Sequence, residues 1–202
     1  MAQGIFPTPV QPARAAGLLG FDVGIAGTVI EVDENAAYWI NSTGTDFSSG
    51  NYVGVPRLVV SKGFSVFSLS GSYAKLGDTD IDIIGGALDV PIIEGGLIKP
   101  TLAVRGSYAT IRGVDEYDLK TYGVELFLSK GFGPVTPYGA IGRVRNDGTG
   151  TIPAPVNRTL TDESDVNRIT VGVRVSLLLP KIAIEATQGE ERSFAAKVSI
   201  GF

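Results

Sequence analysis

The two side chains on which much enzyme chemistry depends are both missing from this chain. Its 202 residues include no histidine and no cysteine. Ser-His-Asp and Cys-His arrangements therefore lack their base or their nucleophile. Zinc sites built on histidine or cysteine are excluded for the same reason. We expect a protein that is not an enzyme and that carries no cofactor.

Carboxylates are the remaining candidates for chemistry, and they gather in two places. The two groups are Asp78, Asp80 and Asp82, and Asp115, Glu116 and Asp118. Calcium prefers several oxygen ligands, so either group could in principle bind it. Neither group has the spacing of an EF-hand loop, and solvated surface acids are the simpler interpretation. We therefore expect no metal site.

The elements that position these side chains are indicated by strict alternation of apolar and polar residues. At the end of the chain, Phe194, Val198, Ile200 and Phe202 alternate with polar or small residues. Such a period of two is typical of a strand with one apolar face. The sequence predicts ten strands, at 17–33, 53–63, 64–76, 79–90, 97–113, 116–131, 134–146, 166–179, 181–189 and 192–202.

The predicted strands and their connections favour a barrel that crosses a membrane. Several strands exceed the five or six residues usual in a soluble sandwich. Tight breaks alternate with longer ones, notably 34–52 and 146–165, as in outer-membrane barrels. Only 19% of the residues are charged, against about 25% in soluble domains. We predict an all-β fold, namely a closed antiparallel transmembrane β-barrel with an up-and-down meander. A soluble β-sandwich or lipocalin-like binder is the further alternative.

Two regions of different character divide the chain. Residues 1–16 contain Pro7, Pro9 and Pro12, which disfavour a central strand or a helix. We predict that residues 1–16 are either a periplasmic tail or a small plug in the barrel mouth. Residues 17–202 are predicted to form the barrel.

Charged residues on the polar faces of the predicted strands are the main candidate site. We expect them to line the lumen, where they must pair or be hydrated. One interpretation is a ladder of ion pairs that fills the lumen, and the other is a narrow water path that favours anions. The predicted luminal residues are Asp22, Arg57, Arg105, Glu125, Arg143, Arg145, Arg174, Glu185 and Lys197.

The last strand carries a family resemblance. Phe202, with Ile200, Val198 and Phe194 at every second position before it, resembles the C-terminal insertion signal of bacterial outer-membrane proteins. The segments 12–17, 55–63 and 122–138 are similar to a group of proteobacterial outer-membrane barrels that have no assigned activity. The resemblance implies the barrel fold, the bacterial outer membrane and assembly by the barrel assembly machinery.

These observations predict an outer-membrane protein that is structural or a narrow passive channel for small solutes or ions. A surface-loop binding protein or adhesin is the alternative. The expected partners are outer-membrane lipid and the assembly machinery. Nucleic acid is not expected, because the net charge is -4 and no basic cluster occurs.

Overall fold

The fold consists of ten strands that form a closed wall. The computed structural model describes residues 8–14, 17–31, 52–76, 80–96, 98–114, 117–152 and 158–202. No helix long and apolar enough to span a membrane occurs among these residues. The strands are β1 (Phe21–Glu31), β2 (Tyr52–Gly63), β3 (Ser68–Lys75), β4 (Asp82–Ile93), β5 (Thr101–Arg112), β6 (Tyr117–Ser129), β7 (Val135–Ile152), β8 (Arg158–Ser176), β9 (Pro180–Gln188) and β10 (Arg192–Gly201).

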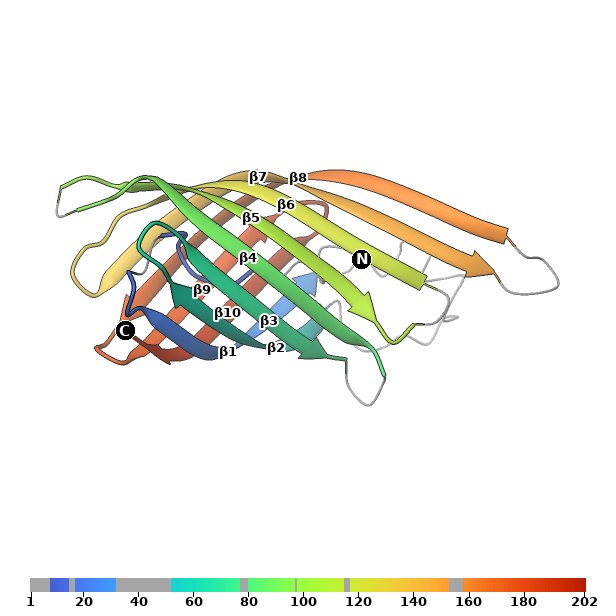
Figure 1. The fold of residues 1–202 in the computed structure, drawn as a ribbon, viewed down its shortest axis with the longest axis horizontal. Helices are drawn as coiled ribbons and strands as arrows, with labels where there is room; N and C mark the ends of the chain where they lie inside the picture. Colours follow the sequence, from blue (N-terminus) through green and yellow to red (C-terminus); the bar gives the residue numbers. More distant parts are fainter. Residues whose placement is uncertain are drawn as a thin grey trace.

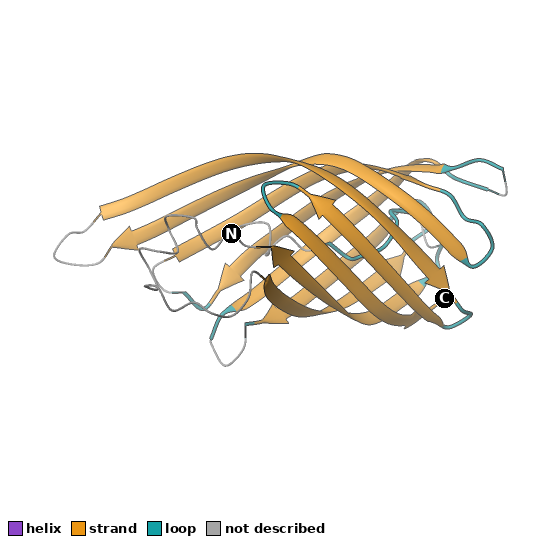
Figure 2. Ribbon diagram, turned by 180° about the vertical axis from the view of Figure 1, so that it is seen from behind, coloured by secondary structure: helices purple, strands orange, loops and turns teal. Residues whose placement is uncertain are grey.

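Each strand pairs antiparallel with its neighbour in the sequence, and the last strand closes on the first. The closing β1–β10 ladder pairs Val23 with Ile200 and Ile25 with Val198. Figures 1 and 2 show the wall from the front and from behind, built from strands on both sides. The predicted closed, ten-stranded up-and-down barrel is confirmed.

The alternation in the sequence becomes an apolar outside and a polar inside. In β10, Phe194, Val198 and Ile200 are more than half exposed, whereas Lys197 and Ser199 are buried. The same alternation runs through β6, where every second residue from Leu119 to Ser129 is buried. A soluble protein has the opposite distribution, so the barrel presents its hydrophobic surface to its surroundings.

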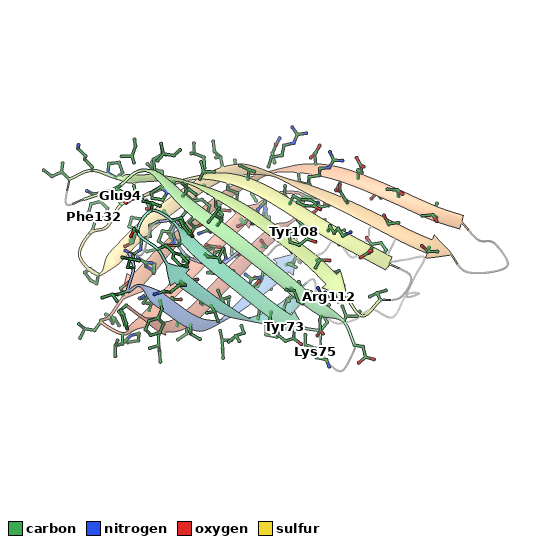
Figure 3. All side chains as sticks on the ribbon, in the orientation of Figure 1. Tyr73, Lys75, Glu94, Tyr108, Arg112 and Phe132 are labelled. Atoms are coloured by element: carbon green, nitrogen blue, oxygen red, sulfur yellow. The ribbon has the colours of Figure 1, made fainter. Side chains whose placement is uncertain are left out.

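The two ends of the barrel differ. One end, called here the short-turn end, carries four connections, at 64–67, 94–100, 130–134 and 177–179, together with the start of β1 and the end of β10. Figure 3 shows Glu94 and Phe132 at this end and Tyr73, Tyr108 and Arg112 toward the other, called here the loop end. Tyr73, Tyr108 and Tyr122 are each about two-fifths exposed on the outer face, where aromatic rings mark the polar boundary of a bilayer.

The prediction of a loop at 146–165 is wrong. Strands β7 and β8 continue through this region and remain paired as far as Ile152 and Arg158. They are the longest strands among the described residues, and Figure 1 shows them projecting beyond the other strands. The prediction failed because strands outside a bilayer need no apolar face, so their sequence looks like a polar loop. The loop predicted at 34–52 lies outside the described residues, except Tyr52, which begins β2.

Candidate functional site

The lumen of the barrel is lined by buried charges. Among the described residues, six cationic and four anionic side chains are buried there. They are Arg57, Arg105, Arg168, Arg174, Lys181 and Lys197, with Asp22, Asp89, Glu125 and Glu185. Each lies on the face of its strand that points away from the apolar exterior. The lumen therefore holds an excess of positive charge, although the whole chain is negatively charged.

Seven of the nine predicted luminal residues lie on the inner face, and two do not. The seven are Asp22, Arg57, Arg105, Glu125, Arg174, Glu185 and Lys197. Whether they line a water path stays a prediction.

Arg143 and Arg145 point outward instead, with side chains that are 66% and 49% exposed. The alternation in β7 could not decide this, because Ile141 on the outer face and Val144 on the inner face are both apolar. Charge is tolerated on the outer face here because each arginine has an acidic partner on the hairpin.

The most enclosed pair in the lumen is Arg105 with Asp89. The guanidinium Nε lies 2.6 Å from Asp89 Oδ1, and Nη2 donates to Oδ2 at 2.9 Å. The Arg105 guanidinium also stacks over the ring of Phe127, at 4.3 Å from its centroid. Such two-point binding restrains both side chains more strongly than a single contact does. The pair connects β4 to β5 across the inner wall.

Asp22 is the centre of a second group of luminal charges. Its Oδ1 accepts a hydrogen bond from Lys197 Nζ at 2.9 Å, and its Oδ2 accepts one from Ser199 Oγ at 3.0 Å. Lys181 Nζ lies 3.3 Å from the same carboxylate. One carboxylate on β1 therefore serves two lysines, one on β9 and one on β10.

Glu125 and Glu185 complete the luminal network. Tyr138 donates a hydrogen bond to Glu185 Oε1 at 2.8 Å. Arg168 lies 3.8 Å from Glu125, a looser ion pair. The network is thus a set of charges distributed around the inner wall of the barrel.

The N-terminal segment, residues 8–14, lies inside the barrel, and residues 8–13 are buried there. Arg57 donates to Thr8 Oγ1 at 3.0 Å, and Lys197 donates to Gln11 Oε1 at 2.8 Å. Arg105 also reaches the Gln11 carbonyl oxygen at 3.0 Å. Three luminal cations therefore bind uncharged oxygen atoms of this segment, which occupies space that water would otherwise fill. The boundary predicted at residue 16 stays a prediction, because residues 15 and 16 are not described.

Sequence reasoning missed several members of the network. Asp89, Lys181 and Tyr138 were not among the predicted luminal residues, and neither was Arg168. Asp89 lies between the apolar residues Leu88 and Val90, and Lys181 directly precedes the apolar Ile182. This alternation could have placed both charges inside. Tyr138 gave no such signal, because a tyrosine in a barrel strand is also common on the outer face, at a membrane interface.

The projecting β7–β8 hairpin is the second candidate site, and its outer face is charged. Arg143 pairs with Asp165 at 2.9 Å, and Arg145 pairs with Asp147 at 2.9 Å and with Glu163 at 2.6 Å. The hydrogen bond from Arg145 to Asp147, together with the charges of Asp147 and Glu163, raises the pKa of Arg145 above its ordinary value. Exposed pairs of this kind contribute little stability, and their charges remain available to a partner.

One edge of β8 has no strand beside it over the projecting part, as far as the described residues go. The ladder between β8 and β9 ends at Ile169 and Gln188, while the ladder between β7 and β8 continues to Arg158. The N–H of Ser176 points toward β7, since it donates to Pro134 O at 2.8 Å. Because a regular strand alternates the direction of its backbone groups, even-numbered residues of β8 bond to β7 and odd-numbered residues face the other way. The odd residues beyond Ile169 have no strand partner among the described residues: Thr159, Thr161, Glu163, Asp165 and Asn167.

The predicted carboxylate groups do not form a metal site in the part of the chain that is described. No set of three or more Asp or Glu side chains is arranged to hold a metal ion there. Asp78, Asp115 and Glu116 lie outside the described residues.

Comparison with known proteins finds likenesses of structure only. No family profile matches the chain, and no characterised protein matches it by sequence. The N-terminal β-barrel domain of Pseudomonas aeruginosa OprF is 9% identical, with a TM-score of 0.45, over 91% of this chain and 98% of that one. Ail of Yersinia pestis, in complex with the heparin analogue sucrose octasulfate, is 10% identical, with a TM-score of 0.36, over 90% and 95% of the two chains. Neisserial surface protein A is 10% identical, with a TM-score of 0.34, over 90% and 94%.

Proposed function

We propose that this chain is a bacterial outer-membrane β-barrel without enzymatic activity that presents the free edge of β8 to an extended segment of another protein. The barrel acts as the anchor, and the projecting hairpin acts as the binding element. The observation that carries the proposal is that no described strand pairs with this edge of β8 beyond Ile169.

The membrane placement is supported by the distribution of side chains. Large apolar residues cover the outside of the wall, including Ile25, Val171 and Val198, each more than half exposed. A closed barrel satisfies its backbone hydrogen bonds within the wall, which is the condition for crossing hydrocarbon with strands. Apolar exposure of this extent would make a soluble protein aggregate.

The filled lumen supports an anchor in preference to a channel. The N-terminal segment and the Arg105–Asp89 pair occupy the interior of a barrel that is narrow at ten strands. The narrow channel remains a second candidate because the lumen has six buried cations against four anions, which favours anions. Such a channel requires residues 8–14 to leave the lumen.

The chemistry of the β8 edge indicates what kind of segment would bind. An added strand would gain backbone hydrogen bonds from the odd-numbered residues of β8. Its side chains would lie about 5 Å from Glu163 and Asp165, so basic residues would be favoured. A second copy of this chain is a poorer fit, because antiparallel self-pairing centred on Glu163 brings two copies of that carboxylate together.

The decisive variant removes one edge-facing N–H without disturbing β7. Thr161→Pro does this, since proline is tolerated where its missing N–H faces away from the sheet. Thr161→Val is the matched control, because it loses the hydroxyl but keeps the N–H. The probe is a fluorescent synthetic peptide that alternates lysine with threonine. A peptide that alternates glutamate with threonine is the control ligand.

We expect the lysine peptide to bind the folded wild-type barrel and Thr161→Val equally in a fluorescence anisotropy titration. Binding to Thr161→Pro should be about fivefold weaker or worse, because one net hydrogen bond is worth about 1 kcal/mol. Equal affinity of Thr161→Pro and Thr161→Val would contradict strand addition. Self-association that competes with the peptide would assign the edge to a second copy.

A further inference from the structure

A small cavity opens at the short-turn mouth of the barrel, between the N-terminal segment and the wall. Its volume is about 20 Å³, which is room for one water-sized group. Its charged lining consists of Arg14, Lys62, Arg174 and Lys181, with Asp22 as the one carboxylate. Positive charge therefore exceeds negative charge four to one around a space that a single oxygen atom could fill.

Two of these cations already have partners. Lys62 Nζ donates to the Leu18 carbonyl oxygen at 2.7 Å, and Lys181 Nζ lies 3.3 Å from Asp22 Oδ2. Asp22 is shared with Lys197, at 2.9 Å. One carboxylate bound to two lysines has little capacity left to neutralise the arginines.

The other two cations, Arg14 and Arg174, have no carboxylate partner in the part of the chain that the structure describes. Arg174 is 7% exposed, and its Nε makes no hydrogen bond among the described residues. Neither Arg174 nor Arg14 forms a salt bridge within that part of the chain. A buried guanidinium without a counter-charge is unfavourable. An anion bound next to Arg174 would therefore stabilise the wall.

The cavity also borders the lipid-facing surface. Phe21 and Phe202 line it, with their rings in edge-to-face contact at 4.5 Å, and both rings are partly exposed on the outside. An anion attached to an acyl chain could therefore place its charged group in the mouth and its chain against the two rings. A free anion would make only the first of these contacts.

We propose that this mouth binds a phosphate group, and that the headgroup of an anionic phospholipid supplies it. One phosphate oxygen enters the cavity and accepts hydrogen bonds from Arg174, while Arg14 lies at the entrance. Guanidinium groups suit phosphate oxygens because they offer several donors in one plane. The site lies at the opposite end of the barrel from the β8 edge. Phosphate binding and strand addition at β8 are therefore independent proposals.

The test compares three ligands on the folded, full-length protein in a nonionic detergent without phosphate. They are a short-chain phosphatidylglycerol, the matching phosphatidylcholine, and inorganic phosphate. Binding is measured by isothermal titration calorimetry, and the thermal midpoint is measured in parallel. The variants are Arg174→Gln and Arg14→Gln, of which the second leaves the wall intact. Arg143→Gln is the matched control, since it removes an arginine that is paired on the outer face of the hairpin.

We expect phosphatidylglycerol to bind wild type and Arg143→Gln alike, and to raise their thermal midpoints more than phosphatidylcholine does. Affinity should fall about tenfold in Arg174→Gln, as for loss of a charged hydrogen bond, and also fall in Arg14→Gln. Inorganic phosphate that binds as tightly as the lipid would retain the phosphate site but assign it to the free ion. Phosphatidylcholine carries the same phosphate, but the cationic lining would repel its trimethylammonium group, so equal binding of both lipids would overturn the assignment to an anionic headgroup. So would an equal loss of affinity in Arg143→Gln and Arg174→Gln.

Discussion

Arg105 and Asp89 face each other directly across the β4–β5 ladder, and both side chains are almost completely shielded from solvent. Sixteen residues separate them in the sequence, yet the antiparallel register makes them cross-strand partners. The pair lies under the N-terminal segment, because Arg105 also binds the Gln11 carbonyl. Contacts inside the barrel that depend on this register therefore join the wall to the N-terminal segment.

Removing one member of this pair should destabilise the barrel strongly. Asp89→Asn leaves the Arg105 charge buried without a counter-charge, and we expect a loss of about 3 to 5 kcal/mol in the free energy of unfolding. The double variant Asp89→Leu with Arg105→Leu should lose less, because no charge is left behind. Urea titrations of the barrel in lipid vesicles measure both. A double variant that is less stable than Asp89→Asn would mean that the pair itself supplies the stability.

A charge introduced on the outer face should destabilise the barrel where that face is apolar, and should have little effect on the projecting β7–β8 hairpin. Ile184 is 54% exposed on the apolar outside of β9, and Ile184→Arg should cost about 2 to 4 kcal/mol if it lies near the bilayer midplane. Thr161→Arg, on the projecting part of β8, should cost less than about 1 kcal/mol. Folding titrations into vesicles that give equal costs at both positions would place the hairpin inside the membrane.

The N-terminal segment should control conductance through the lumen. We expect the wild-type barrel to be electrically silent in planar bilayers, and a variant lacking residues 2–14 to conduct small ions. The reversal potential in a salt gradient should show a preference for anions, because six buried cations face four anions. Heat-modifiable migration on a gel confirms that the variant is folded. A folded variant that stays silent would show that the wall charges alone close the lumen.

The C-terminal aromatic should be needed for assembly. Phe202 contacts Phe21 at the seam where β10 closes on β1, and its role as an insertion signal stays a prediction. Phe202→Ser should reduce the yield of folded barrel in the outer membrane. Phe132→Ser is the control, because Phe132 is a similarly exposed aromatic at the same end but lies outside the last strand. Equal yields of the two variants in membrane fractions would remove the basis for the signal.

The sequence predicts which face of a strand points into the barrel only where the two faces differ clearly in polarity. In β10, every second residue is apolar or small and the other face is polar or small, so the inner face could be predicted correctly. In β7, Ile141 and Val144 make both faces partly apolar, and the inward assignment of Arg143 was therefore wrong.

Other features could not be predicted because they depend on the closed barrel. The partner of Arg105 follows from the register of β4 with β5, which alternation alone does not specify. The position of residues 8–13 in the lumen follows from hydrogen bonds to three different strands. The length of the β7–β8 hairpin could not be predicted because polar residues occur on both faces of its projecting part, so the sequence shows no apolar alternation there.

The most direct test of the central claim is residue-resolved amide hydrogen exchange along β8 in the folded barrel, measured by NMR. The account predicts alternation over the projecting part. Amides of the odd-numbered residues Thr159, Thr161, Glu163, Asp165 and Asn167 should exchange rapidly, and those of Leu160, Asp162, Ser164 and Val166 should be protected by β7. Addition of the lysine peptide should then slow the odd-numbered amides. Uniform protection along this part of β8 before any ligand is added would show that the edge is already covered, and would contradict the account.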